Sequence, residues 1–188
     1  MPTAAPEIPP IADQAKFNLE RWSILCADPF YASLDHRIET DAHGSVIMSP
    51  PPAFDHSDRR GEVLKLLLQH APSGGSALPE SPVSTSGGVK AIDVIWISAQ
   101  RRKKAVDGML LTKAPEICIE ILSPSNTRSE IDEKRRLYFE SGADEVWICG
   151  LDRSMRFFHS AAPDGEPLTA SEICPDFPQR LPSADQSA

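Results

Sequence analysis

Two short apolar segments constrain the fold of this chain more than any other feature. The segments 91–97 (AIDVIWI) and 116–122 (EICIEIL) carry apolar residues at both odd and even positions. Successive side chains of a strand point to opposite faces, so a segment that is apolar on both faces indicates a strand covered on both sides. The sequence therefore predicts a central sheet with helices on both faces, an α/β or α+β class of fold.

The segments around these two strands complete the expected core. Strands are expected at about 76–83, 91–98, 116–123 and 145–149, and helices at about 57–70 and 130–141. This order, αβββαβ, predicts three strands in an antiparallel meander and a crossover helix that leads to a fourth, parallel strand. A turn at 151–154 adds a strand at 155–159. A first helix capped by Asp13 and a hairpin with its turn at Asp41–Gly44 precede the core.

The length of 188 residues suits one domain with tails. We expect a disordered, Pro- and Ala-rich N-terminus at 1–11, a single domain at 12–162 and a loosely held tail at 163–188. No apolar run approaches the roughly 20 residues that span a bilayer, and the first residues lack a signal-peptide pattern. These features predict a cytoplasmic protein that does not enter a membrane.

Cysteine content and charge argue against some classes of function. The cysteines, Cys26, Cys118, Cys149 and Cys174, are too scattered for a typical zinc site, and we expect free thiols rather than a disulfide framework. The formal net charge of −8 argues weakly against a dedicated nucleic-acid binder. The basic run 101–104 is an exception, since an enzyme that releases its product can be acidic overall and basic only where it contacts its substrate.

Three ionisable residues stand where packing should exclude them. Asp93 and Glu120 each interrupt one of the two apolar strands. Burial of an unpaired carboxylate costs several kcal/mol or forces its protonation, so these groups need compensation, which a bound cation would supply. On a helical wheel of the segment 130–141, Lys134 falls in the middle of the apolar face, between Leu137 and Tyr138. Glu130 points in the same direction.

Each of these residues also has a structural explanation. Asp93 could cap a turn, Glu120 could form a buried ion pair with Lys134, and Lys134 could extend its ammonium to solvent. Taken together, two strand carboxylates and an inward lysine favour a functional site. Carboxylate oxygens suit magnesium or manganese better than zinc. Two carboxylates, such a metal and a lysine are the requirements of phosphodiester hydrolysis.

The same residues carry a resemblance to a known family. The region 92–147 resembles the Uma family of restriction-endonuclease-like proteins, within the PD-(D/E)XK nuclease superfamily. The resemblance rests on E-I-L-S-P-S at 120–125, on E-V-W at 145–147, on Arg37–Glu39 upstream, and on Gly44, His56, Lys134, Tyr138 and Gly142. It covers approximately residues 15–160, and the L-S-P-S element after the strand glutamate is its most specific part.

The resemblance implies a restriction-endonuclease-like core, with a central mixed sheet between helices, and a metal-dependent nuclease site. Asp93 matches the first acid of the motif and Glu120 the second, with the Ile121 carbonyl as a candidate backbone ligand for Mg²⁺ or Mn²⁺. Leu122 stands where the superfamily places its lysine, and the resemblance implies that Lys134 on the following helix replaces it.

Three further residues match family positions and have open roles. Glu39 and His56 match recurrent positions and could support the metal ligands or be purely structural. Glu130 stands where the family usually has aspartate, so its role is less certain.

Two functions of different classes follow. The first is a metal-dependent endonuclease that hydrolyses DNA, acts as a homodimer and contacts nucleic acid through Arg101, Arg102, Lys103 and Lys104. The second is a catalytically inactive module that binds nucleic acid or protein and retains the nuclease fold. The three charges in the core favour the endonuclease. Another hydrolase mechanism lacks a Ser/His/Asp or Cys/His arrangement.

Overall fold

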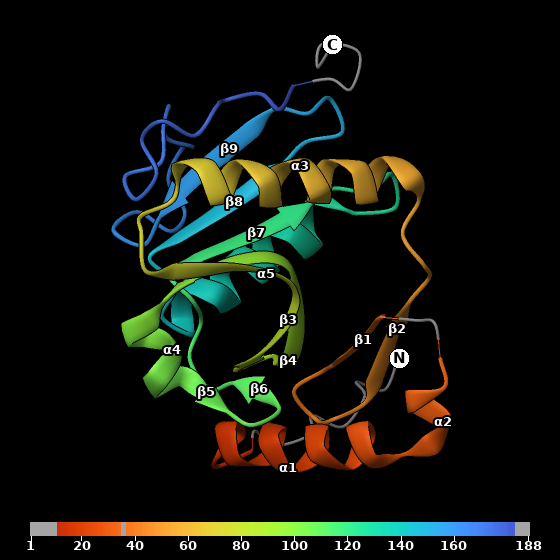
Figure 1. Cartoon of the computed structure of the whole chain (residues 1–188). Coiled ribbons are helices and arrows are strands. Elements are labelled where there is room, and N and C mark those ends of the chain that lie inside the picture. Colours follow the sequence, from red (N-terminus) through yellow and green to blue (C-terminus); the bar gives the residue numbers. More distant parts are fainter. Residues whose placement is uncertain (1–10, 35–36, 183–188) are drawn as a thin grey trace, which may run out of the picture.

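A strongly curved central sheet organises the chain, as the computed structural model shows (Figure 1). The structure describes residues 11–34 and 37–182, so the expected disorder of the N-terminus concerns residues that lie almost entirely outside it. In chain order the elements are α1 (Gln14–Ala27), α2 (Pro29–Ala32), β1 (Arg37–Thr40), β2 (Val46–Ser49), α3 (Phe54–His70), β3 (Gly75–Thr85), β4 (Gly88–Ser98), α4 (Ala99–Ala105), β5 (Val106–Asp107), β6 (Leu110–Leu111), β7 (Ile117–Ile121), α5 (Arg128–Glu140), β8 (Glu145–Cys149) and β9 (Met155–His159).

The topology of the main sheet confirms the predicted core. Its strand order is β5-β6-β3-β4-β7-β8-β9. Strand β4 pairs antiparallel with β3 and β7, whereas β7 pairs parallel with β8 because α5 crosses over between them. Strand β9 returns antiparallel to β8. The order α3-β3-β4-β7-α5-β8 is therefore the αβββαβ order that the sequence predicts.

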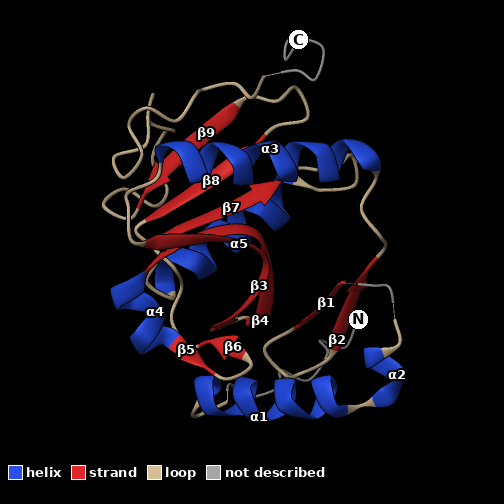
Figure 2. Cartoon of the chain, in the orientation of Figure 1, coloured by secondary structure: helices blue, strands red, loops and turns tan. Residues whose placement is uncertain are grey.

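Helices cover both faces of the sheet, as the apolar pattern of its central strands requires. Every residue of β7 is buried, and so is β4 up to Ile97. Val94 and Trp96 belong to the core cluster that contains the buried residues of α3, whereas Ile95 and Ile97 belong to the cluster beneath α5. Figure 2 shows α3 and α5 on opposite sides of the red strands.

The hairpin β1–β2 forms a separate two-stranded sheet that lies against β4. The Val89 amide donates to the Thr40 hydroxyl at 2.9 Å, and Lys90 Nζ donates to the Thr40 carbonyl at 3.0 Å. Gly88, with φ of 99°, permits this approach, since a Cβ there would lie 2.3 Å from the Asp41 carbonyl oxygen. This docking brings β1 close to the central strands.

The expectation of a loosely held tail from residue 163 is wrong for its described part, 163–182. Glu145 in β8 is fully buried and accepts hydrogen bonds from the Ser171 hydroxyl at 2.7 Å and the amides of Glu172 and Ile173 at 2.7 and 3.0 Å. Beyond this anchor, Cys174, Phe177 and Leu181 enter the core cluster beneath α3. A buried partner thus orders a segment whose composition indicated a loose tail.

The segment 100–114, which connects the strands expected at 91–98 and 116–123, has structure of its own. It forms most of α4 and the short strands β5 and β6, which extend the sheet beyond β3. Among the described residues, no helix combines the length and apolarity that a membrane crossing requires.

Candidate functional site

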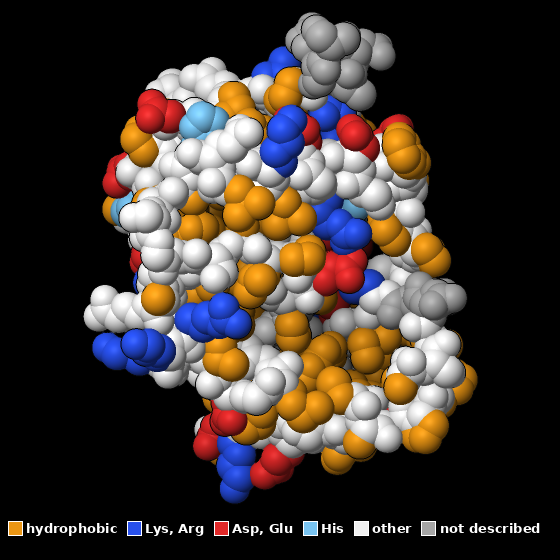
Figure 3. All heavy atoms as spheres, viewed as in Figure 1, with side chains coloured by type: hydrophobic (Ala, Val, Ile, Leu, Met, Phe, Trp, Pro, Cys, Tyr) orange, Lys and Arg blue, Asp and Glu red, His pale blue; other side chains and the backbone are white. Residues whose placement is uncertain are grey.

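Side chains from five elements converge where the middle of β4 lies beside the C-terminal end of β7. They are Arg37 and Glu39 from β1, His56 from the first turn of α3, Asp93 from β4, Glu120 from β7, and Lys134 and Tyr138 from α5. Figure 3 shows basic and acidic side chains together on the surface between α3 and the hairpin, the region where these elements meet.

Asp93 is 2% exposed, and both of its carboxylate oxygens have partners. Oδ1 pairs with the Arg37 guanidinium. Oδ2 accepts the Ile121 amide at 2.8 Å and lies 3.5 Å from His56 Nε2. Burial raises the pKa of Asp93, but the contact with His56, the charge of Arg37 and the Ile121 amide outweigh it and lower the pKa overall. The carboxylate is therefore the stable form in the folded protein.

Glu120 is 4% exposed and has a different environment. Its Oε1 accepts the Tyr138 hydroxyl at 2.6 Å, and its Oε2 accepts Lys134 Nζ at 3.2 Å, with Arg37 at 4.0 Å. Burial raises the pKa of Glu120, and the nearby negative charge of Asp93 adds to this, so that Lys134 and Arg37 compensate only in part. The two strand carboxylates therefore shift in opposite directions.

Lys134 points into this cluster, as the helical wheel predicts. Its Nζ donates to Glu39 Oε1 at 2.9 Å in addition to Glu120. Burial lowers the pKa of Lys134, but the charges of Glu120 and Glu39 outweigh it and raise the pKa overall. For Glu39, burial raises the pKa while Lys134 and Arg37 lower it, with a lower pKa as the result. Lys134 is thus a cation held between two carboxylates.

Of the residues with open roles, Glu39 and His56 reach the cluster and Glu130 does not. Helix α5 begins at Arg128, two residues earlier than expected, with Thr127 as its N-cap. Glu130 closes the capping box there, since its Oε2 accepts the Thr127 amide at 2.8 Å. A helical wheel assumes that each side chain points away from the helix axis, and on this basis Glu130 lies on the inward side. As the N3 residue of a capping box, Glu130 instead turns back toward the N-terminus of the helix.

The basic run lies away from the carboxylates. Helix α4 follows the end of β4, so Ser98 is about 17 Å along the strand from Asp93. Arg101 is half-buried and donates to Asp144 at 2.9 Å and to the Gly142 carbonyl at 3.0 Å, with Glu116 at 3.4 Å. These contacts tie α4 to the segment before β8, and the nucleic-acid contact expected of Arg101 stays a prediction. Arg102, Lys103 and Lys104 are exposed.

Sequence reasoning missed Arg37 as a member of the site and assigned no role to Tyr138. Strand periodicity could have indicated Arg37, because residues i and i+2 of a strand share a face and Arg37 therefore lies on the same face as Glu39. Tyr138 lies one helical turn after Lys134, so the wheel placed both on one face. Nothing in the sequence alone showed that the hairpin would dock against β4.

The donor set of the site suits a hard divalent cation. Asp93 and Glu120 supply carboxylate oxygens on adjacent strands, and the Ile121 carbonyl is the third ligand that the family resemblance implies. In residues 11–34 and 37–182, no group of three or more His, Cys, Asp and Glu side chains is arranged to hold a metal. The Arg37 guanidinium contacts Asp93 and lies 4.0 Å from Glu120 Oε2, so a positive charge already lies beside both carboxylates. The oxygens of Asp93, Glu120 and the Ile121 carbonyl are of the kind that such a metal prefers.

A curved mixed sheet between helices, with two acids on adjacent strands and a lysine beside them, defines a protein of the restriction-endonuclease-like class. The family model described as "Uma2: Putative restriction endonuclease" matches residues 25–176, and the chain belongs to this family. No curated protein matches the sequence.

A solved structure supports the fold independently. It is described as the crystal structure of "a putative nuclease belonging to DUF820 from Anabaena variabilis". This chain superposes on it with a TM-score of 0.58 and 17% sequence identity, over 69% of this chain and 74% of the other. At this identity the similarity concerns the fold.

Proposed function

We propose that this protein is a metal-dependent endonuclease that hydrolyses phosphodiester bonds of DNA. One observation carries the proposal: the acids Asp93 and Glu120 and the cation Lys134, which come from β4, β7 and α5, lie in one contact network. Such a cluster of buried charges is costly for a fold and is typical of a functional site.

The chain's own residues have distinct roles in this proposal. Asp93, Glu120 and the Ile121 carbonyl would hold Mg²⁺ or Mn²⁺. The cation would polarise the scissile phosphate and lower the pKa of the attacking water. Lys134 offsets the negative charge that develops on the phosphate in the transition state. Tyr138 orients Glu120 through the 2.6 Å hydrogen bond to Oε1, and the Ile121 amide orients Asp93.

We further propose that DNA is the substrate, contacted by the exposed cations Arg102, Lys103 and Lys104.

We propose a homodimer, because cleavage of both strands of a duplex at one target calls for two sites and a two-fold dimer supplies them. A cytoplasmic location is supported by the cysteines of the described residues, which are free thiols as a reducing compartment favours.

Cleavage of plasmid DNA tests the proposal directly. The wild type should cleave with Mn²⁺ or Mg²⁺ and not with EDTA, and Asp93→Asn and Glu120→Gln should each abolish cleavage while the fold survives. Glu140→Gln is the matched control, since Glu140 pairs with Arg136 on the outer side of α5. Unchanged metal affinity in both acid variants, measured by calorimetric titration with Mn²⁺, would contradict the assignment.

One observation favours the alternative, a catalytically inactive binding module. The carboxylate oxygens of Asp93 and Glu120 already have partners within the protein, so the cluster is compensated without a metal. An inactive module would bind nucleic acid or protein with the same affinity in Mn²⁺ and in EDTA, and Asp93→Asn would leave that affinity unchanged. The endonuclease proposal expects metal binding and cleavage to disappear together in that variant.

A further inference from the structure

Arg37 has an unusual position for an arginine at the end of a short strand. Its guanidinium contacts Asp93 Oδ1, Glu39 Oε1 at 3.0 Å and Glu120 Oε2 at 4.0 Å. It reaches these groups from the hairpin sheet, whereas Asp93 and Glu120 belong to the main sheet. Among the cationic side chains of the described residues, Arg37 is the one whose contacts include both predicted metal-binding carboxylates.

The charge of Arg37 is permanent, but its contacts are incomplete. Burial lowers the pKa of the guanidinium, yet the charges of Asp93, Glu120 and Glu39 outweigh this and raise it, so the group stays protonated. Its Nε is buried without a hydrogen-bond partner. A buried donor without a partner costs about 1–3 kcal/mol. The position is therefore held by charge, at the expense of one hydrogen bond.

A divalent cation and this guanidinium need the same oxygens. A metal bound by Asp93 and Glu120 requires one oxygen from each, and a close guanidinium adds like-charge repulsion. The side chain of Arg37 is 20% exposed, so it has a route toward solvent.

We propose that Arg37 occupies the cation position in the metal-free protein and that a divalent metal binds by displacing its guanidinium from Asp93 and Glu120. This inference rests on the proposed function, since it concerns the same metal site. Arg37 keeps the two carboxylates compensated until the metal arrives, and the metal affinity is reduced by the fraction of molecules in which Arg37 is in place.

Substitution of Arg37 by methionine separates charge from packing. Arg37→Met retains an apolar stem and removes the guanidinium. Its affinity for Mn²⁺, measured by calorimetry without DNA, should exceed that of the wild type by about 10-fold or more, because the competing cation is gone. The metal-free variant should unfold at a lower urea concentration than the wild type, and saturating Mn²⁺ should reverse that loss.

Arg60→Met is the matched control. Arg60 is similarly buried, with a side chain 21% exposed, and pairs with Glu80, but it contacts neither Asp93 nor Glu120. Its Mn²⁺ affinity should equal that of the wild type. Equal or weaker Mn²⁺ binding by Arg37→Met than by the wild type would overturn the proposal while leaving the metal site in place. If neither protein binds Mn²⁺, the metal site and the displacement of Arg37 are both refuted.

The wild type provides a second measurement if Arg37→Met does not fold without metal. The Nε–H signal of Arg37 in a nitrogen-15 NMR spectrum can be assigned by its loss in Arg37→Lys. Titration with diamagnetic Mg²⁺ should shift this signal in step with metal binding, whereas the Arg60 signal stays in place. Saturation with Mg²⁺ and an unchanged Arg37 signal would refute displacement.

Discussion

Asp93 and Glu120 occupy adjacent strands but differ in what their charges do for the fold. In the sequence the two carboxylates are equivalent, since each interrupts an apolar strand. In the structure, Arg37, His56 and the Ile121 amide stabilise the Asp93 carboxylate, so its pKa is lowered, whereas burial leaves the pKa of Glu120 raised. The expected effects of the two substitutions on stability therefore have opposite signs.

We predict that Asp93→Asn destabilises the metal-free protein at pH 7 by about 2 kcal/mol, from a pKa lowered from 3.8 to about 2. A lowered pKa contributes stability above the unfolded value, and this contribution is lost as the pH falls through the folded value. The deficit should hence become smaller as the pH falls toward the folded value of about 2. The raised pKa of Glu120 contributes stability in acid that is lost as the pH rises. At pH 7 the free energy of unfolding of Glu120→Gln should therefore equal or exceed that of the wild type. Urea melts from pH 3 to pH 7 in EDTA provide the measurement, and equal losses at pH 7 would contradict the assignment.

Lys134 combines a structural and a proposed chemical role, and one substitution tests both. Lys134→Met keeps the apolar stem but leaves Glu39 and Glu120 with one cationic partner fewer. We predict a loss of about 3 kcal/mol in stability, as when a buried ion pair loses one partner. Metal binding should persist, and the single-turnover rate of the folded fraction should fall by about 100-fold or more. Cleavage that merely follows the folded fraction in urea would limit Lys134 to a structural role.

At the scale of elements, the basic run of α4 contains side chains in two different environments. Arg101 is tied to Asp144 and Glu116, whereas Lys103 is exposed. We predict that Lys103→Glu leaves the unfolding midpoint unchanged and lowers DNA affinity uniformly across sequences, with a flatter salt dependence. Arg101→Glu should instead lower the unfolding midpoint, because Glu116 and Asp144 lose their cationic partner and face a new carboxylate. Unchanged DNA affinity of Lys103→Glu at low salt would place α4 away from the substrate.

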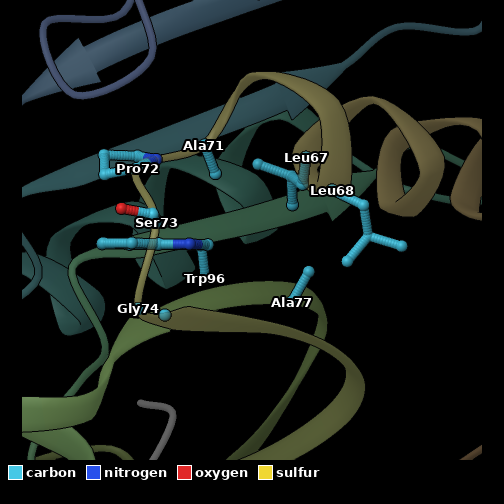
Figure 4. A pocket seen from close by; sticks show the side chains of 9 residues that line it. Leu67, Leu68, Ala71, Pro72, Ser73, Gly74, Ala77 and Trp96 are labelled. Carbon is cyan, nitrogen blue, oxygen red and sulfur yellow. The ribbon is translucent and has the colours of Figure 1, made fainter.

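The element scale also includes a surface hollow that is not part of the site. This hollow, of about 140 Å³, lies between the end of α3 and the start of β3 and is lined by Leu67, Leu68, Pro72 and Trp96 (Figure 4). Gly75 belongs to this region because a Cβ there would lie 2.4 Å from the Trp96 ring. Glycine is thus required for the turn from α3 into β3 to pass over Trp96.

At the scale of the whole molecule, Glu145 joins the C-terminal segment to the sheet. We predict that Glu145→Gln costs about 2 kcal/mol, since an amide nitrogen cannot accept the hydrogen bonds that the carboxylate accepts from Ser171, Glu172 and Ile173. Limited proteolysis should then cut the segment beyond residue 163 before the rest of the chain. Glu172→Gln is the control, because its side chain is 66% exposed. Equal protection of that segment in both variants would show that Glu145 does not hold it.

Local pattern was sufficient for the central sheet. Apolar residues on both faces of 91–97 and 116–122 require cover on both sides, and the alternation of helix and strand leaves few ways to supply it. The inward direction of Lys134 likewise follows from the 3.6-residue period of a helix. These features depend on residues that are neighbours in sequence, so they can be predicted from the sequence alone.

The partners of those residues come from long-range packing. Arg37 reaches Asp93 across 56 positions because Gly88 lets the hairpin lie against β4, and Glu145 meets Ser171 across 26. The opposite pKa shifts of Asp93 and Glu120 follow from the same contacts. A charge in a buried strand requires a counter-charge, and periodicity reveals that requirement; which side chain meets it depends on how distant segments dock.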